Sequence, residues 1–169
     1  MAVLILFLGA ALSAHQATSS AITPKSVERM IDRYGARRTV QKLTKQDFND
    51  TKSDFGKFDV VLDGISAGDP RWLALVTKIY PGTDAAAAES LPIAVAQALP
   101  KNPTGVLRFF ASSSWLRKVC GYPMIEPTDK EMRAYFKAAI PAVRAVREPT
   151  LQRAKKVCLT ELMKAQQTP

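Results

Sequence analysis

The two cysteines, Cys120 and Cys158, are the side chains with the most distinctive chemistry in this sequence, and no others occur. In an exported chain, two cysteines most often form a disulfide. Cys158 falls on the apolar stripe of an expected helix, and Cys120 ends a short helix just before a proline-containing loop. A bridge would therefore fix that loop to the C-terminal helices. Two alternatives stay open: a pair of buried free thiols, and a redox pair, which usually has the closer spacing C-x-x-C.

Metal and cofactor chemistry is not expected. Two thiols without a nearby histidine cannot complete a tetrahedral metal site. The single histidine, His15, lies next to an expected cleavage point, so histidine-dependent triads and dyads are not expected either. No phosphate-binding loop, dinucleotide fingerprint or nucleophile elbow occurs. Asp59 and Asp63, one helical turn apart, leave a carboxylate-dependent hydrolase as a minor alternative. We expect a protein that is not an enzyme.

Basic side chains form a second candidate site. Lys and Arg number 24 against 15 Asp and Glu, which gives a net charge of +9. Six of them lie on stripes of two expected C-terminal helices and are our candidate ligand-binding residues: Lys130, Arg133, Lys137, Arg144, Arg153 and Lys156. They would suit an anionic component of the cell envelope, although a solvated helix face is the simpler interpretation. Nucleic acid is not expected as a partner, because no recognition motif is present.

The N-terminus predicts export. Residues 1–14 form an apolar run that ends in small residues, which is typical of a secretory signal peptide cleaved after residue 14 or 17. The alternative is an N-terminal helix buried in the core. Residues 15–22 are small and polar and predict a disordered lead-in. The sequence has no second long apolar segment, so we expect no transmembrane segment in the mature form and a periplasmic or secreted location.

Helix start signals and apolar periodicity recur along residues 23–165, which we expect to form one helical domain followed by a frayed tail at 166–169. Polar residues before proline and one capping box mark the expected starts: Thr23-Pro24, Asp69-Pro70, Asn102-Pro103 and Thr128–Glu131. No alternating run predicts a strand. The fold class is therefore all-α, a compact single domain of about eight or nine short helices. A short array of helical hairpins is the alternative.

Glycine, proline and apolar positions indicate where individual helices end or bend. Glycine at position 35 should close the first helix, and residues 70–80 read as one amphipathic helix. Pro92 and Pro141 fall inside later helical patterns, where we expect a kink or a break. Trp72 and Trp115 lie on helical stripes and are expected in the core.

These features favour an exported binding protein whose partner is another protein. In size, expected export, helicity and paired cysteines, the chain resembles small periplasmic immunity or inhibitor proteins that neutralise cell-wall-degrading toxins. The resemblance rests on these general features and not on a motif. It implies an inhibitor-type function, for which residues 120–127 are the best candidate contact. An envelope or anionic-ligand binder that uses the C-terminal basic helices is the main alternative.

Overall fold

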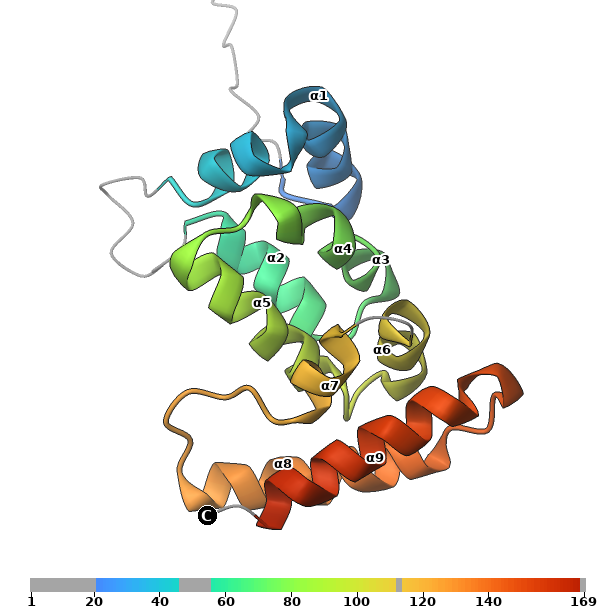
Figure 1. Ribbon diagram of the computed structural model, residues 1–169. Helices are drawn as coiled ribbons and strands as arrows, with labels where there is room; N and C mark the ends of the chain where they lie inside the picture. Colours follow the sequence, from blue (N-terminus) through green and yellow to red (C-terminus); the bar gives the residue numbers. More distant parts are fainter. Residues whose placement is uncertain (1–20, 46–55, 112–113, 168–169) are drawn as a thin grey trace, which may run out of the picture.

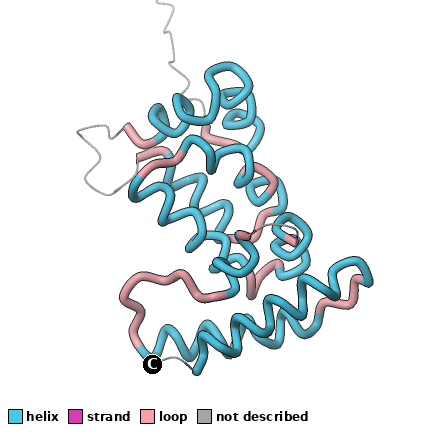
Figure 2. The backbone as a smooth tube through the Cα atoms, in the orientation of Figure 1, coloured by secondary structure: helices cyan, strands magenta, loops and turns pink. Residues whose placement is uncertain are grey.

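The computed structural model describes residues 21–45, 56–111 and 114–167. The expected signal peptide, His15, residues 15–20 of the expected lead-in and residues 168–169 of the expected tail lie outside these ranges. Every regular element in the described residues is a helix, so the expected all-α class is confirmed (Figure 2).

The elements are, in chain order, α1 (Pro24–Leu43), α2 (Phe58–Ser66), α3 (Pro70–Leu73), α4 (Val76–Ile79), the 3-10 turn η1 (Tyr80–Gly82), α5 (Ala85–Ala98), α6 (Pro103–Phe110), α7 (Trp115–Cys120), α8 (Asp129–Ala145), the 3-10 turn η2 (Pro149–Leu151) and α9 (Gln152–Gln167). The helices form one compact domain, as expected. Helix α1 lies at one end of the molecule, and α8 and α9 form an antiparallel hairpin at the other end (Figure 1). Helices α2 to α7 lie between these ends.

The expected helix starts are confirmed, and side-chain caps explain them. Asp69 accepts the backbone N–H of Arg71 at 2.8 Å, and Asn102 accepts that of Gly105 at 2.8 Å. Thr23 and Thr128 each form a capping box with the residue three positions later. A cap of this kind satisfies backbone donors that have no partner inside the helix. At four helix starts, the residue at which the helix begins is therefore determined by local sequence.

The single helix expected over residues 70–80 is wrong, because the structure divides this stretch into α3, α4 and η1. The backbone N–H of Leu75 bonds to the carbonyl of Trp72, three residues back, at 3.0 Å. This tighter turn rotates the second half of the stretch relative to the first. Leu73, Leu75 and Val76 are all buried in this arrangement. A single regular helix would not place all three on one buried face.

Of the kink or break expected at Pro92 and Pro141, the break is wrong, because neither proline interrupts its helix. Helix α5 continues through Pro92, and α8 continues through Pro141. Each proline removes one backbone hydrogen bond, but tertiary packing supplies most of a helix's stability in a folded protein. Pro92 itself is buried in the packed face of α5.

Gly35 divides α1 into two helical halves, as expected from its position in the sequence. Its φ of 77° and ψ of 163° lie in a region that only glycine adopts readily. The backbone bends there, and the two halves are seen as an angled pair in Figure 1. At the other end of the chain, α9 extends through Gln167, so the helix includes the first two residues of the expected tail.

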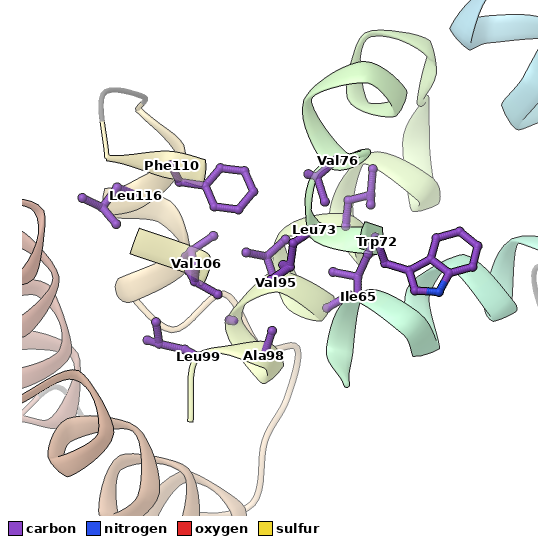
Figure 3. Packing of buried hydrophobic residues seen from close by; sticks show 14 of the residues in the cluster. Ile65, Trp72, Leu73, Val76, Val95, Ala98, Leu99, Val106, Phe110 and Leu116 are labelled. Carbon is purple, nitrogen blue, oxygen red and sulfur yellow. The ribbon is translucent and has the colours of Figure 1, made fainter. Parts of the chain in front are cut away.

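The core is a continuous cluster of apolar side chains contributed by every α-helix. Ile65 and Leu73 meet Val95 where α2, α3 and α5 come together, and Val106 and Phe110 of α6 extend the cluster toward α7 (Figure 3). Trp72 is 7% exposed, which confirms its expected burial. Trp115 is partly buried and stacks on Phe110 with ring centroids 5.7 Å apart.

Candidate functional site

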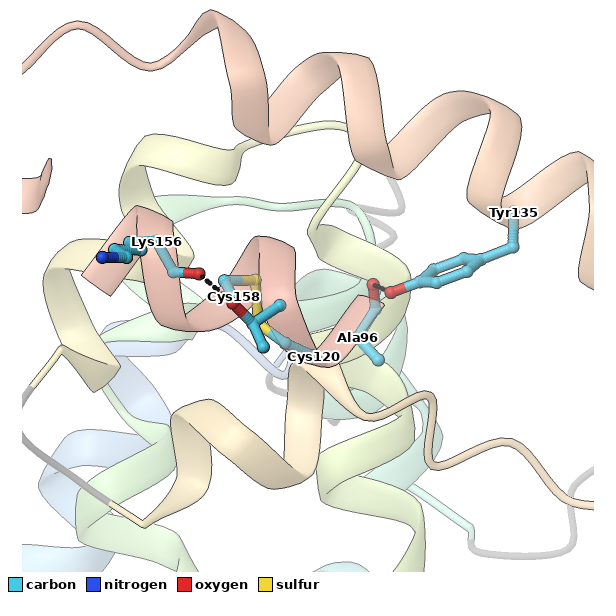
Figure 4. Close-up of a disulfide and its surroundings, with 6 residues drawn as sticks. Ala96, Cys120, Tyr135, Lys156 and Cys158 are labelled. Carbon is cyan, nitrogen blue, oxygen red and sulfur yellow. Dashed lines mark hydrogen bonds between the residues drawn. A yellow bond between two sulfur atoms is a disulfide. The ribbon is translucent and has the colours of Figure 1, made fainter. Parts of the chain in front are cut away.

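Cys120 and Cys158 form a disulfide, with an S–S distance of 2.02 Å and a Cα–Cα distance of 5.1 Å. The expected pairing is confirmed, and both residues are fully buried. The bridge joins the last residue of α7 to the middle of α9 (Figure 4). The segment that leaves α7 is therefore fixed covalently to the C-terminal hairpin.

The loop that follows, residues 121–127 (the 121–127 loop), has an unusual backbone. Tyr122 has a φ of 61° and Glu126 a φ of 44°, values that side-chain-bearing residues seldom adopt. The loop starts one residue after Cys120 and ends at the Thr128 cap of α8. A covalent bridge and a capping box thus fix its two ends, which supports a conformation that is costly for an isolated chain.

Aromatic packing holds the start of this loop. The Tyr122 ring lies 4.9 Å from the rings of both Tyr135 and Phe136, measured between centroids. Burial raises the pKa of Tyr122, and the charge of Glu131 raises it further. The Tyr135 hydroxyl donates to the backbone carbonyl of Ala96 at 3.2 Å, and this bond ties α8 to α5 (Figure 4). Burial is also the main cause of the raised pKa of Tyr135, and electrostatic interaction with Tyr122 raises it further. Both phenols are therefore neutral near neutral pH.

Two hollows lie on either side of the 121–127 loop, and Tyr122 and Met124 line both. The first, of about 580 Å³, continues to the start of α8 and the end of α9, where Met132, Glu161 and Lys164 line it. The second, of about 480 Å³, adjoins α5 and α8. The loop is thus a ridge between two shallow depressions of mixed polarity.

The 121–127 loop exposes one large apolar side chain, that of Ile125. Ile125 is 65% exposed, more than any other large hydrophobic side chain in the described residues. Exposure of a large aliphatic side chain to water is unfavourable, so its position on this loop favours contact with another surface. Met163 of α9, on the C-terminal hairpin, is a second exposed apolar side chain, with 44% of its surface exposed.

The structure places all six candidate basic residues at the surface. Lys130, Arg133, Lys137 and Arg144 are exposed on α8, and Arg153 and Lys156 are exposed on α9. Arg133 lies 3.7 Å from Asp129, four residues earlier on the same helix, in an exposed pair of little energetic value.

The basic residues of α9 face different neighbours. Arg153 lines a hollow of about 510 Å³ together with Arg117 of α7. The basic residue of α9 that reaches α8 is Lys155, which donates to the carbonyls of Arg144 and Val146 at 2.6 and 2.9 Å. Arg153 is therefore directed toward α7, while Lys155 caps the end of α8.

The candidate carboxylates lie apart from these hollows. Asp59 and Asp63 are one turn apart on α2, and a depression of about 140 Å³ beside α5 includes Asp63 but not Asp59. The described residues contain no group of three or more His, Cys, Asp or Glu side chains placed to hold a metal ion. In the same residues, no helix has the length and apolarity required to span a bilayer.

Sequence reasoning predicted a proline-containing loop after Cys120 and residues 120–127 as the candidate contact, but it missed several members of the site. The contribution of Glu161 and Lys164 depends on how α9 packs beside the loop, which no local pattern encodes. The positive φ values of Tyr122 and Glu126 also give no sequence signal, since neither residue is glycine or asparagine. Ile125, flanked by Pro123 and Pro127, could have been noticed as an apolar residue in a loop.

Comparisons with known proteins found no family model, no curated protein and no solved structure that matches this chain.

Proposed function

We propose that this protein is an exported, non-enzymatic binding protein that contacts another protein through the 121–127 loop. The observation that carries the proposal is the exposed Ile125 on a loop fixed by the disulfide at one end and a helix cap at the other. A rigid loop loses little conformational freedom on binding, so more of the contact energy appears as affinity. The depressions on both sides offer space for the partner's side chains.

The same bridge supports the proposed compartment. A disulfide between buried cysteines is compatible with an oxidising compartment, and disulfides are rare in the reducing cytosol. Together with the apolar residues 1–14, it supports a periplasmic or secreted location. The finer proposal is an inhibitor or immunity-type role, in which the loop ridge would occupy a groove of a secreted enzyme.

An anionic envelope component is the second candidate partner for the C-terminal hairpin. Lys130, Lys137 and Arg144 are exposed on α8 and make no ion pair within the described part of the chain. Clustered exposed cations attract anionic polymers and surfaces over about one Debye length. This contact would depend strongly on salt, whereas an apolar contact through Ile125 would not.

The test uses a pair of matched variants. Ile125→Asp places a charge at the ridge, and Val60→Asp places the same charge at another exposed apolar position, on α2. The partner is first captured from the exported fraction with the oxidised protein, then purified and titrated directly against each variant. We expect Ile125→Asp to weaken binding at least about tenfold, which corresponds to the loss of one interface anchor, and Val60→Asp to leave it unchanged.

Two results would refute the proposal: equal loss in both variants, or unchanged affinity of Ile125→Asp. An affinity that falls steeply with added salt, and is lost with Lys130→Glu, Arg133→Glu and Lys137→Glu together, would instead support the anionic partner.

A further inference from the structure

Charges on α1 are separated by sign around the helix. The helix carries six basic and two acidic side chains. Both acids lie near Lys78 of α4: Glu28 accepts a hydrogen bond from the Lys78 ammonium group, and Asp32 adds to the electrostatic effect that raises the pKa of Lys78. The two acidic side chains of α1 therefore interact with a cation of α4.

The basic side chains around the bend at Gly35 have a different setting. The Arg33 guanidinium carbon lies 5.3 Å from the centroid of the Tyr34 ring, and the Lys42 ammonium nitrogen lies 4.9 Å from it. One ring thus gathers two cations from the two halves of α1. Arg37 and Arg38 are exposed on the next turn. These four cations make no ion pair among the described residues.

Close packing makes this arrangement rigid. Gly82 of η1 lies so near α1 that a Cβ on it would come within 2.3 Å of the Ala36 carbonyl carbon and 2.4 Å of the Arg37 nitrogen. The second half of α1 is therefore seated directly on η1. Gly35, in contrast, has open space around its α-carbon, so the bend points outward. The basic cluster lies at the end of the molecule opposite the α8–α9 hairpin (Figure 1).

We propose that the α1 corner, defined as Arg33, Tyr34, Arg37, Arg38 and Lys42, is a docking surface for a bilayer of anionic phospholipids. Clustered Lys and Arg side chains near an anionic bilayer each contribute about 1 kcal/mol to binding. Tyrosine, with an apolar ring and a polar hydroxyl, is enriched at membrane interfaces. Tyr34 is 36% exposed and projects beside the cations.

Attachment at this corner is peripheral and not insertive. The apolar side chains of α1 pack against the protein's own core: three are buried and two are partly buried (Val27, Val40 and Leu43; Met30 and Ile31). Electrostatic attraction to phosphate headgroups, with the Tyr34 ring at the headgroup level, is the contact that remains. This inference goes beyond the proposed binding function and does not depend on it. It would place the 121–127 loop away from the bilayer and accessible to a partner.

The experiment measures partition of the oxidised protein onto vesicles of phosphatidylcholine mixed with phosphatidylglycerol, against vesicles of phosphatidylcholine alone. The test variant carries Arg33→Gln, Arg37→Gln and Arg38→Gln. The matched control carries Lys101→Gln, Lys118→Gln and Arg147→Gln, which removes the same charge from exposed positions outside α1. We expect about a hundredfold weaker partition for the α1 variant, from three charges of about 1 kcal/mol each. The control variant should partition nearly as well as the unaltered protein.

Further arms separate the possible sources of anionic charge. Free glycerophosphate at millimolar concentration should not compete if the bilayer is the ligand, and full competition would overturn the proposal in favour of a small-anion site. Equal loss in both triple variants would overturn it in favour of non-specific attraction by net charge. Absence of partition onto phosphatidylglycerol vesicles, or equal partition onto phosphatidylcholine alone, would also overturn it. Circular dichroism of both variants establishes that each remains folded.

Discussion

Gly82 and Ala36 are in backbone-to-backbone contact, closer than any side chain between them would permit. A Cβ at position 82 would lie 2.3 Å from the Ala36 carbonyl carbon and 2.6 Å from its oxygen. The obstacle is main chain and not the end of a flexible side chain, so it cannot move aside without shifting α1. One glycine therefore determines how the second half of α1 sits on the rest of the molecule.

Gly82→Ala should destabilise the protein by about 1–3 kcal/mol, the usual cost of forcing an extra methyl group into a packed site. Because the strain falls on α1, the same variant should also weaken vesicle partition if the α1 corner binds lipid. Urea denaturation followed by far-UV circular dichroism gives the stability change. A loss below about 0.5 kcal/mol, the range of ordinary surface substitutions, would show that α1 is not tightly seated on η1.

Gly35→Ala tests the second glycine of this region by a different mechanism. Nothing lies within 4 Å of a Cβ at this position, yet the φ of 77° and ψ of 163° are unfavourable for alanine. We expect a loss of about 1–3 kcal/mol from backbone strain alone. An unchanged urea midpoint would mean that α1 can straighten at residue 35 without cost.

Local signals in the sequence predicted where helices begin, because capping depends on three or four neighbouring residues. Thr23, Asp69, Asn102 and Thr128 all cap as their sequence contexts indicate. Asp84, by contrast, precedes α5 without making a side-chain cap hydrogen bond.

Features set by tertiary packing could not be predicted in this way. The continuity of α5 through Pro92 and the division of residues 70–80 depend on neighbours distant in sequence. For the candidate site, the disulfide and the loop were predictable from the positions of Cys120 and the two prolines. The hollows beside the loop were not, because α9 forms one wall through Glu161 and Lys164.

Tyr135→Phe should remove the hydroxyl that donates to the Ala96 carbonyl and cost about 0.5–1.5 kcal/mol, the net value of one such hydrogen bond. The same residue makes stability depend on alkaline pH. Its folded pKa is raised by burial, so the neutral phenol is favoured in the folded state. Its contribution to stability is fully present below the unfolded pKa of about 10 and is lost as pH rises above that value.

Spectrophotometric titration at 295 nm checks this assignment. Because burial raises its pKa, Tyr135 should ionise above the ordinary range of a tyrosine, and Tyr135→Phe should abolish that late step. A titration in which Tyr135→Phe removes an early step would contradict the burial of the phenol.

The Thr128–Glu131 capping box should make stability depend on acidic pH. The Thr128 hydroxyl and backbone N–H both donate to the Glu131 carboxylate, at 2.7 and 2.9 Å, and these bonds lower its pKa. A lowered folded pKa means that the stabilisation is present above the unfolded pKa, about 4.3, and is lost as pH falls through the folded value. Glu131→Gln should therefore differ from the unaltered protein at pH 7 and converge with it in strong acid.

Urea midpoints between neutral and acidic pH give the comparison. Glu126→Gln, which changes another carboxylate lining the same hollow as Glu131, provides a control on whether any charge loss has this effect. A constant difference between Glu131→Gln and the unaltered protein at all pH values would mean that the carboxylate's charge does not act in the cap. Thr128→Ala should cost about 1 kcal/mol by removing the cap from the other side.

The Cys120–Cys158 bridge should contribute the largest single stabilisation. It closes a segment with a sequence separation of 38 residues, for which the chain-entropy model gives about 4 kcal/mol. Cys120→Ala with Cys158→Ala should lower the urea midpoint accordingly, and reduction of the unaltered protein should have a similar effect. A reductant should not change the midpoint of the double alanine variant, which controls for side effects of the reagent.

The bridge should also govern the 121–127 loop. Because Tyr122 and Glu126 hold unfavourable φ values, the loop should relax when Cys120 is no longer tied to α9. Amide hydrogen exchange in residues 121–127 should then rise more than exchange in α1 or α2, which lie away from the bridge. If the loop binds a partner as proposed, affinity should fall on reduction even where the protein remains folded. Unchanged loop exchange after reduction would mean that aromatic packing around Tyr122, and not the disulfide, holds the loop in place.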